Sequence, residues 1–322
     1  MAINAIEIKN VYKRFDNAAQ NAVDGVSADI PAGSFITVMG TSGSGKTTLL
    51  KAINRIYEIT AGDILFFGEN IKGLKVEEYR KKIGYVIQQI GLFPHMTVAE
   101  NIAMVPKTLK WNRKRTDERI EYLLDLVHLP SWIYKNRYPR QLSGGQQQRV
   151  GLARAMAADP AVMLMDEPFG AIDAITRQTL QNELLQIQRQ LRKTILFVTH
   201  DIREAFKLGD KVIIMNEGRI QQYDTPYNIM FNPVNSYVNQ LVSCDDVLDR
   251  LNVLRAEHLL SRLEAPPCAD DICVKKEEPL NIVLGIFIQK GIPRVVVTDD
   301  NESAVGQINW NKFQEIPVLR KG

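Results

Sequence analysis

Short apolar segments, separated by polar turns, recur along much of the chain and predict a series of buried strands. Helical stretches separate some of these segments, so the overall pattern is that of an α/β protein. Seven segments have the length and apolar content of strands: Ile6–Val11, Val23–Ile30, Phe35–Met39, Asp63–Phe67, Lys82–Ile87, Ala161–Met165 and Thr194–Thr199. Two more, Lys211–Met215 and Arg219–Tyr223, flank Asn216-Glu217-Gly218 and predict a hairpin.

Helical patterns interrupt the strands between residues 97 and 159. They cover Val98–Val105, Thr116–Val127 and Gly145–Ala158. We therefore expect a mostly helical subdomain, about residues 97–159, inserted into an α/β core.

The pattern changes again near Ser243, and we expect one domain over residues 1–243 and a second over 244–322. In the second domain, helices are predicted over Asp246–Leu260 and Leu280–Lys290, with Ala265-Pro266-Pro267 breaking the chain between them. Strands are predicted over Val295–Thr298 and Ala304–Ile308.

Composition supports two units and excludes several classes of protein. The chain has 322 residues and a net charge of +3, too small to indicate nucleic-acid binding by itself. Residues 244–322 carry ten Lys and Arg against thirteen Asp and Glu, whereas the rest carries thirty against twenty-four. The three cysteines, Cys244, Cys268 and Cys273, fit neither a zinc site nor a disulfide framework, so we expect reduced thiols. No apolar run approaches the roughly 20 residues of a membrane span, and no signal peptide is expected.

A glycine-rich loop follows the strand Phe35–Met39 and precedes a predicted helix. It matches the phosphate-binding pattern G-x-x-x-x-G-K-[ST], and strand, loop and helix are the context that this pattern requires. Backbone N–H groups and the helix N-terminus attract phosphate, Lys46 adds a full charge, and the hydroxyl of Thr47 is a ligand for Mg²⁺. The predicted nucleotide-binding residues here are Gly40, Thr41, Ser42, Gly43, Ser44, Gly45, Lys46, Thr47 and Thr48.

Polar side chains follow three other predicted strands. Asp166 and Glu167 end one apolar strand, and His200 ends the next along the chain. Carboxylates at the C-terminal edge of an open sheet suit a catalytic site, so we expect Asp166 to hold Mg²⁺ through water and Glu167 to activate the attacking water. We expect His200 to contact the γ-phosphate and the attacking water, although a lone histidine is usually structural. We expect Gln88 to contact Mg²⁺, although Gln88 alone would be uninformative.

A second anion site is predicted at Ser143-Gly144-Gly145-Gln146, which begins a helix. A single γ-phosphate does not need two such sites from one chain. The pattern therefore favours two copies of the chain packed head to tail, each lending this loop to the other's nucleotide. A capped flexible turn is the simpler alternative.

Taken together and in this order, these motifs resemble those of the ABC (ATP-binding cassette) ATPases over roughly residues 5–240. The resemblance implies a P-loop ATPase core with a RecA-like mixed sheet, an antiparallel β subdomain and the helical subdomain. It implies that the loop Gly170–Asp173 bridges two subunits, with Asp173 near the nucleotide, and that Phe15, or less readily Tyr12, stacks on adenine. A core aromatic is the alternative for Phe15.

The resemblance also implies a function: ATP hydrolysis with Mg²⁺ by a homodimer whose opening drives separate membrane permease subunits. Such a subunit would lie at the cytoplasmic face of the plasma membrane, with a substrate-binding protein as an indirect partner and no nucleic acid. A DNA-repair ATPase is disfavoured because no heptad run or cysteine cluster interrupts the cassette. A purely regulatory module is disfavoured because Glu167 and His200 are both present.

The segment Glu167–Arg177 resembles importers of quaternary-amine osmoprotectants such as glycine betaine, carnitine and choline. An importer of an amino acid or methionine is the alternative. Residues Glu278–Phe313 resemble one CBS (cystathionine β-synthase-type) repeat, which implies a small α+β regulatory domain that responds to a nucleotide or to ionic strength. However, Asn309-Trp310-Asn311-Lys312 replaces the usual ribose-binding pattern, and a packing domain is the alternative.

Overall fold

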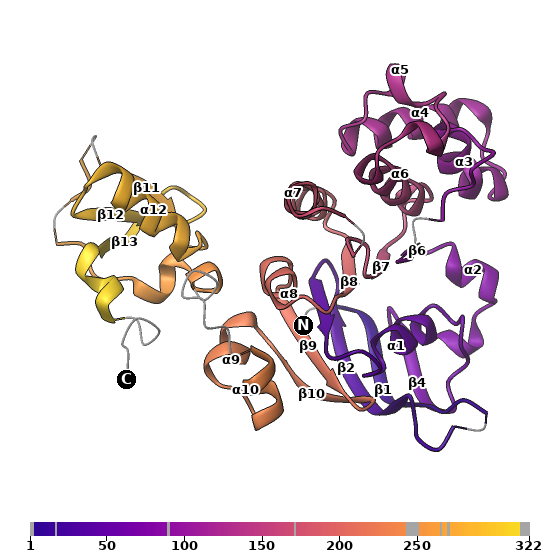
Figure 1. Cartoon of the computed structure of the whole chain (residues 1–322), viewed down its shortest axis with the longest axis horizontal. Coiled ribbons are helices and arrows are strands. Elements are labelled where there is room, and N and C mark those ends of the chain that lie inside the picture. The colour runs from indigo at the N-terminus through magenta and orange to yellow at the C-terminus, as the bar shows by residue number, and fades with distance from the viewer. Residues whose placement is uncertain are drawn as a thin grey trace. The chain divides into compact units, whose positions relative to one another are not determined.

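The computed structural model describes residues 3–16, 18–88, 91–170, 172–242, 251–264, 266–268 and 271–315. The chain divides into two compact units, Met1–Thr225 and Pro226–Gly322 (Figure 1). Among the sequence predictions, Cys244, Ala171 of the loop Gly170–Asp173, and the first five residues of the helix predicted over Asp246–Leu260 lie outside the described residues.

The larger unit is built on a six-stranded, mostly parallel sheet of order β10-β9-β3-β8-β7-β6. Only β9 and β10 pair antiparallel, as the predicted hairpin. The three central strands are buried at every position, which explains their continuous apolar sequences. The strands are β3 (Phe35–Met39), β6 (Ile83–Val86), β7 (Val162–Asp166), β8 (Thr194–Val198), β9 (Lys211–Asn216) and β10 (Arg219–Asp224).

The register of this sheet brings the ends of its strands to one edge. Asp166 at the end of β7 lies opposite Val198, and Val198 also lies opposite Val38 of β3. The loops that follow β3, β7 and β8 therefore leave the sheet side by side, at the edge where open α/β sheets build their sites.

A second, antiparallel sheet of order β2-β1-β4-β5 shares an apolar core with the first. Ile6, Ile8 and Ile30 of this sheet pack in one cluster with Ile36 and Leu164 of the parallel sheet. Helix α1 (Lys46–Ile53) contributes Leu49, Leu50 and Ile53 to the same cluster. The strands are β1 (Asn4–Lys13), β2 (Val23–Pro31), β4 (Ala61–Phe66) and β5 (Glu69–Asn70), followed by η1 (Ile71–Gly73) and α2 (Val76–Arg80).

The predicted helical subdomain is present between β6 and β7 (Figure 1). Its first helix begins at a capping box in which the side chains of Thr97 and Glu100 each bind the other's backbone N–H. The elements are α3 (Val98–Thr108), α4 (Arg113–Leu126), α5 (Ser131–Tyr134), η2 (Pro139–Gln141) and α6 (Gly144–Met156). Two helices of the core complete this unit: α7 (Ala174–Leu191) and α8 (Ile202–Leu208). The expected ATPase fold, a mixed sheet with an antiparallel β subdomain and a helical subdomain, is thus confirmed.

The smaller unit begins at Pro226, earlier than the boundary expected near Ser243. The physical reason is that Tyr227 and Phe231 pack against its apolar core, which Val283, Phe287 and Ile308 help to form. Its elements are α9 (Pro226–Phe231), α10 (Ser236–Val242), η3 (Ala256–Leu259), β11 (Cys273–Lys275), α12 (Leu280–Lys290), β12 (Arg294–Thr298), β13 (Ala304–Asn309) and η4 (Trp310–Glu315). The three strands form a sheet of order β11-β12-β13, and the helix predicted over Leu280–Lys290 and both predicted strands are confirmed. The helix predicted over Asp246–Leu260 is wrong in its second half, because Arg255 forms a β-bridge with Pro279 and the short 3-10 helix η3 follows it.

Candidate ATP-hydrolysis site

The glycine-rich loop connects β3 to α1 and ends at a residue that only glycine can occupy without strain. Gly45, the N-cap of α1, has φ of 99°, and a Cβ there would lie 2.3 Å from the carbonyl oxygen of Ala22. The loop therefore turns directly into the helix, and the first N–H groups of α1 lack partners within the helix. This is the geometry in which a helix N-terminus binds phosphate.

Lys46 folds back over this loop. Its Nζ donates to the carbonyl oxygens of Gly40 at 2.9 Å and Thr41 at 2.8 Å, and to Ser44 Oγ at 3.4 Å. The side chain is buried, and burial lowers the pKa of Lys46, an effect that Glu167 and Asp166 partly offset. Among the described residues no carboxylate forms an ion pair with Lys46, so its charge remains available for an anion.

Thr47 and Asp166 form a pair beside the loop. Thr47 Oγ1 donates to Asp166 Oδ1 at 2.8 Å. Burial raises the pKa of Asp166, and the hydrogen bond from Thr47 opposes that rise. A hydroxyl and a buried carboxylate at this distance offer oxygen ligands of the kind that Mg²⁺ prefers. Within the described part of the chain there is no larger cluster of His, Cys, Asp and Glu that could hold a metal ion.

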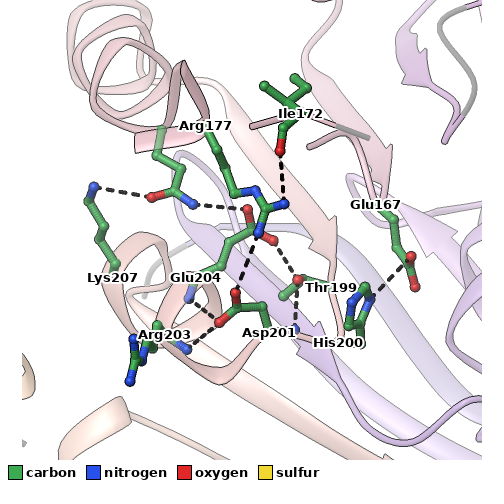
Figure 2. Close-up of polar contacts among 10 residues, drawn as sticks. Glu167, Ile172, Arg177, Thr199, His200, Asp201, Arg203, Glu204 and Lys207 are labelled. Carbon is green, nitrogen blue, oxygen red and sulfur yellow. Dashed lines mark hydrogen bonds and ion pairs between the residues drawn. The ribbon is translucent and has the colours of Figure 1, made fainter. Parts of the chain in front are cut away.

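The Glu167 side chain contacts residues of two other loops. Its Oε2 accepts a hydrogen bond from Gln88 Nε2 at 3.1 Å and lies 3.2 Å from His200 Nδ1. Figure 2 shows the Glu167 and His200 side chains turned toward each other. Glu167 itself has a left-handed backbone, with φ of 45°, which is unusual for a residue with a side chain and is often found at functional sites. Gln88 lies at this edge, where its side chain contacts Glu167, and its contact with Mg²⁺ stays a prediction.

The Ser143–Gln146 segment begins α6, as predicted. Ser143 and Gln146 form a capping box, with Gln146 N donating to Ser143 Oγ at 3.3 Å and Ser143 N donating to Gln146 Oε1 at 3.0 Å. Ser143 and Gly144 are exposed. No hydrogen bond between described residues joins this segment to residues 40–48, so the structure does not bring the two predicted anion sites together within one chain.

Asp173 and Phe15, two further predicted site residues, lie elsewhere on the larger unit. Asp173 caps α7, and its Oδ1 accepts a hydrogen bond from Thr176 N at 3.0 Å, a bond that lowers the pKa of Asp173. The Phe15 ring is 37% exposed, meets Tyr57 edge-on at a centroid distance of 5.1 Å, and has Lys13 Nζ 5.0 Å from its centroid. An exposed aromatic ring suits stacking on a base, which for Phe15 stays a prediction.

Sequence reasoning missed a polar network behind the site. It contains Thr199 and Asp201, the two neighbours of His200, together with Arg177, Gln181 and Glu204. One sequence feature could have indicated this network: Arg177 and Gln181 are four residues apart, so they lie on the same face of the helix that follows Asp173.

The fold and this site define a P-loop ATPase, and comparison with known proteins identifies its family. The family model described as "ABC transporter" matches residues 23–170. The chain is 42% identical over 304 residues to the osmoprotectant import ATP-binding protein OsmV of Salmonella typhimurium, covering 94% of this chain and 78% of that protein. It is 44% identical over 313 residues to the glycine betaine uptake system ATP-binding protein YehX of Escherichia coli, covering 97% and 99%.

A solved structure gives the same assignment. A dimeric, post-hydrolysis ATP-binding cassette, MJ0796 bound to ADP and Pi, matches with a TM-score of 0.61 and 32% identity, over 69% of this chain and 98% of that one. The chain belongs to the ABC transporter family as an ATP-binding subunit, and it binds nucleotide and hydrolyses ATP to drive transport. The part of the chain that the structure describes has no helix long and apolar enough to cross a membrane.

Proposed function

We propose that this chain is the ATPase subunit of an importer of quaternary-amine osmoprotectants and that it acts on Mg²⁺-ATP. Lys46 would bind the outer phosphates, since its buried ammonium group donates to three neutral oxygens and forms no ion pair with a described carboxylate. Thr47 and Asp166 would hold Mg²⁺, Asp166 through water, and the ion when bound would neutralise charge on the phosphates. Gly40–Thr48 would surround the phosphates, and Phe15 would stack on adenine.

One observation carries the catalytic assignment: Gln88 and His200 both contact the same oxygen of Glu167. A carboxylate held in this way at the edge of the sheet is placed to orient a water molecule and accept its proton. Gln88, which follows β6 at the start of the helical subdomain, would link that carboxylate to the subdomain. His200 would fix the position of the attacked phosphate.

We further propose that two copies of the chain enclose two nucleotides. Ser143, Gly144, Gly145 and Gln146 of one copy would complete the phosphate site of the other. Two observations support this arrangement: no hydrogen bond between described residues joins this segment to the chain's own phosphate loop, and the similar MJ0796 cassette is dimeric. Asp173 would lie between the copies, and the dimer would drive separate permease subunits at the cytoplasmic face of the membrane, with an extracellular binding protein as an indirect partner.

The cargo assignment rests on the relatives. OsmV and YehX are named for import of osmoprotectants and of glycine betaine, and a third relative, OpuCA of Bacillus subtilis, is named for glycine betaine, carnitine and choline. This last protein is 43% identical over 325 residues, covering 98% of this chain and 84% of the relative. An importer of another solute, such as an amino acid or methionine, is the competing proposal.

The C-terminal unit would regulate the ATPase. The succession of α12, β12 and β13 supports the proposed likeness to a CBS repeat. Its proposed signal is a nucleotide or ionic strength. We place the functional boundary after Ser243, and truncation there and after Thr225, the structural division, tests it.

Uptake of radiolabelled glycine betaine tests the proposal. The chain and its permease subunits would be restored to a strain lacking them, with Glu167→Gln as the matched inactive control. We expect uptake with the parental chain, none with the variant, and suppression by unlabelled choline or carnitine. Uptake of labelled methionine or amino acids, with no uptake of betaine, would favour the competing proposal.

A further inference from the structure

A buried polar network lies directly behind His200. Thr199 Oγ1 donates to a carboxylate oxygen of Glu204, and Gln181 Nε2 donates to the other, Oε1, at 3.0 Å. Gln181 Oε1 in turn accepts a hydrogen bond from Lys207 Nζ at 3.1 Å. Thr199, Gln181 and Glu204 are all at most 7% exposed. Because buried hydrogen-bonded groups resist displacement, this network fixes the backbone on the N-terminal side of His200.

Asp201 fixes the other side of His200. Its backbone N donates to Thr199 Oγ1 at 3.0 Å, and its Oδ1 caps α8 by accepting from Arg203 N at 2.8 Å and Glu204 N at 3.3 Å. His200 is thus held between two residues whose side chains belong to one connected set of hydrogen bonds.

Arg177 joins this set to a different loop (Figure 2). Its Nη2 donates to the carbonyl oxygen of Ile172 at 3.0 Å, and its Nη1 lies 3.9 Å from Asp201 Oδ2. Ile172 precedes Asp173, the cap of α7, in the loop that follows Glu167. Arg177 and Gln181 are four residues apart on α7, so one face of the helix reaches both the Ile172 carbonyl and the His200 segment.

A purely stabilising role explains this arrangement poorly. The Arg177–Asp201 pair is long at 3.9 Å, and its side chains are 32% and 35% exposed, which leaves little net stabilisation. The buried Nε of Arg177 has no hydrogen-bond partner among the residues that the structure describes. What the side chain does provide is contact with two segments at once, the loop after Glu167 and the loop that carries His200.

We propose that Arg177 is a positioning residue for ATP hydrolysis, which holds the Ile172–Asp173 segment and the His200 segment as one rigid element. The inference rests on the proposed function of Glu167 and His200. If Asp173 meets a second copy of the chain, a change in that contact reaches His200 through Arg177, because the arginine contacts both segments.

Steady-state ATPase kinetics on the full-length chain test this proposal. Arg177→Ala should lower kcat about tenfold, because a small displacement of catalytic groups is costly, while KM for ATP and nucleotide affinity stay within about twofold. Arg177→Lys, which keeps the charge but contacts only one partner at a time, should recover part of kcat. Arg189→Ala is the matched control, since Arg189 is an exposed arginine of the same helix, and it should leave both constants unchanged.

Asp201→Asn provides a second test that does not depend on how Arg177→Ala folds. Asparagine is an equally good helix cap, so α8 should remain capped while the attraction to Arg177 is removed, and kcat should again fall with KM unchanged. Parental kcat in both Arg177→Ala and Asp201→Asn would overturn the proposal. Parallel losses of kcat, nucleotide affinity and melting temperature in these variants would also overturn the proposal, because they would show a general structural role. A parental chain without ATPase activity would instead refute the proposed function.

Discussion

Replacing Lys46 by methionine should separate nucleotide binding from fold stability. The ammonium group is buried among two carbonyl oxygens and a hydroxyl and forms no ion pair with any described carboxylate. Removing it relieves the cost of burying a charge and loses only these hydrogen bonds. The melting temperature without nucleotide should therefore change little in Lys46→Met, because the two effects oppose each other.

The response to nucleotide should change greatly. A ligand at 100 times its Kd stabilises a protein by about 2.7 kcal/mol, which for a unit of this size is a rise in melting temperature of about 5–10 °C. Loss of a charge-assisted hydrogen bond of about 3 kcal/mol weakens binding roughly 150-fold. At the same ligand concentration the rise should then shrink to about 1 °C or less.

Differential scanning fluorimetry with a non-hydrolysable ATP analogue and Mg²⁺ measures both quantities. Lys75→Met is the matched control, because Lys75 is an exposed lysine of the same unit. A Lys46→Met protein that keeps the parental rise would refute the assignment of Lys46 to the phosphates. A variant that melts about 10 °C lower without nucleotide would show that Lys46 is a structural residue instead.

The remaining predictions concern stability, pH and magnesium. Gly45→Ala should destabilise the chain by more than about 2 kcal/mol in urea unfolding, because its Cβ would meet Ala22 O. Gly68→Ala is the control, with φ of 81° but open space around it, and equal losses in the two variants would contradict the steric argument. Burial raises the pKa of Glu204, so the folded chain binds this proton more tightly than the unfolded chain. The associated stability is present below the ordinary glutamate pKa and is lost as pH rises through the raised value. The melting temperature of Glu204→Gln should therefore not show this fall with rising pH. A fall that persists in the variant would exclude Glu204 as its source. Thr47→Val should raise the Mg²⁺ concentration for half-maximal ATPase activity several-fold, because the hydroxyl beside Asp166 is lost, and an unchanged magnesium titration would exclude Thr47 as a ligand.

Much of the fold could be predicted because local sequence determines it. β3 has the predicted bounds, since Phe35–Met39 is a continuous apolar run that ends at a glycine-rich loop. Helix α7 was not predicted, although Leu180, Leu184, Ile187 and Leu191 recur at helical spacing within it.

The contacts within the site could be anticipated only in part. That Asp166, Glu167 and His200 share an edge follows from parallel pairing of their strands, which the alternation of strands and helices predicts. The position of Gln88 against Glu167, and the link from Arg177 to Ile172 and Asp201, depend on the sheet register and on how α7 packs. No short stretch of sequence encodes either. The structural division after Thr225 could not be predicted for a similar reason, because Tyr227 and Phe231 pack against an apolar cluster that includes Val283, more than 50 positions away.

The association state of the Glu167→Gln variant tests the central claim most directly. Sedimentation equilibrium would compare the purified variant with Mg²⁺-ATP, with Mg²⁺-ADP and without nucleotide. The account predicts a dimer holding two ATP molecules only in the first condition, with no turnover, because the segment Ser143–Gln146 of each copy completes the other's site. A variant that hydrolyses ATP at the parental rate, or that has the same mass in all three conditions, would contradict it.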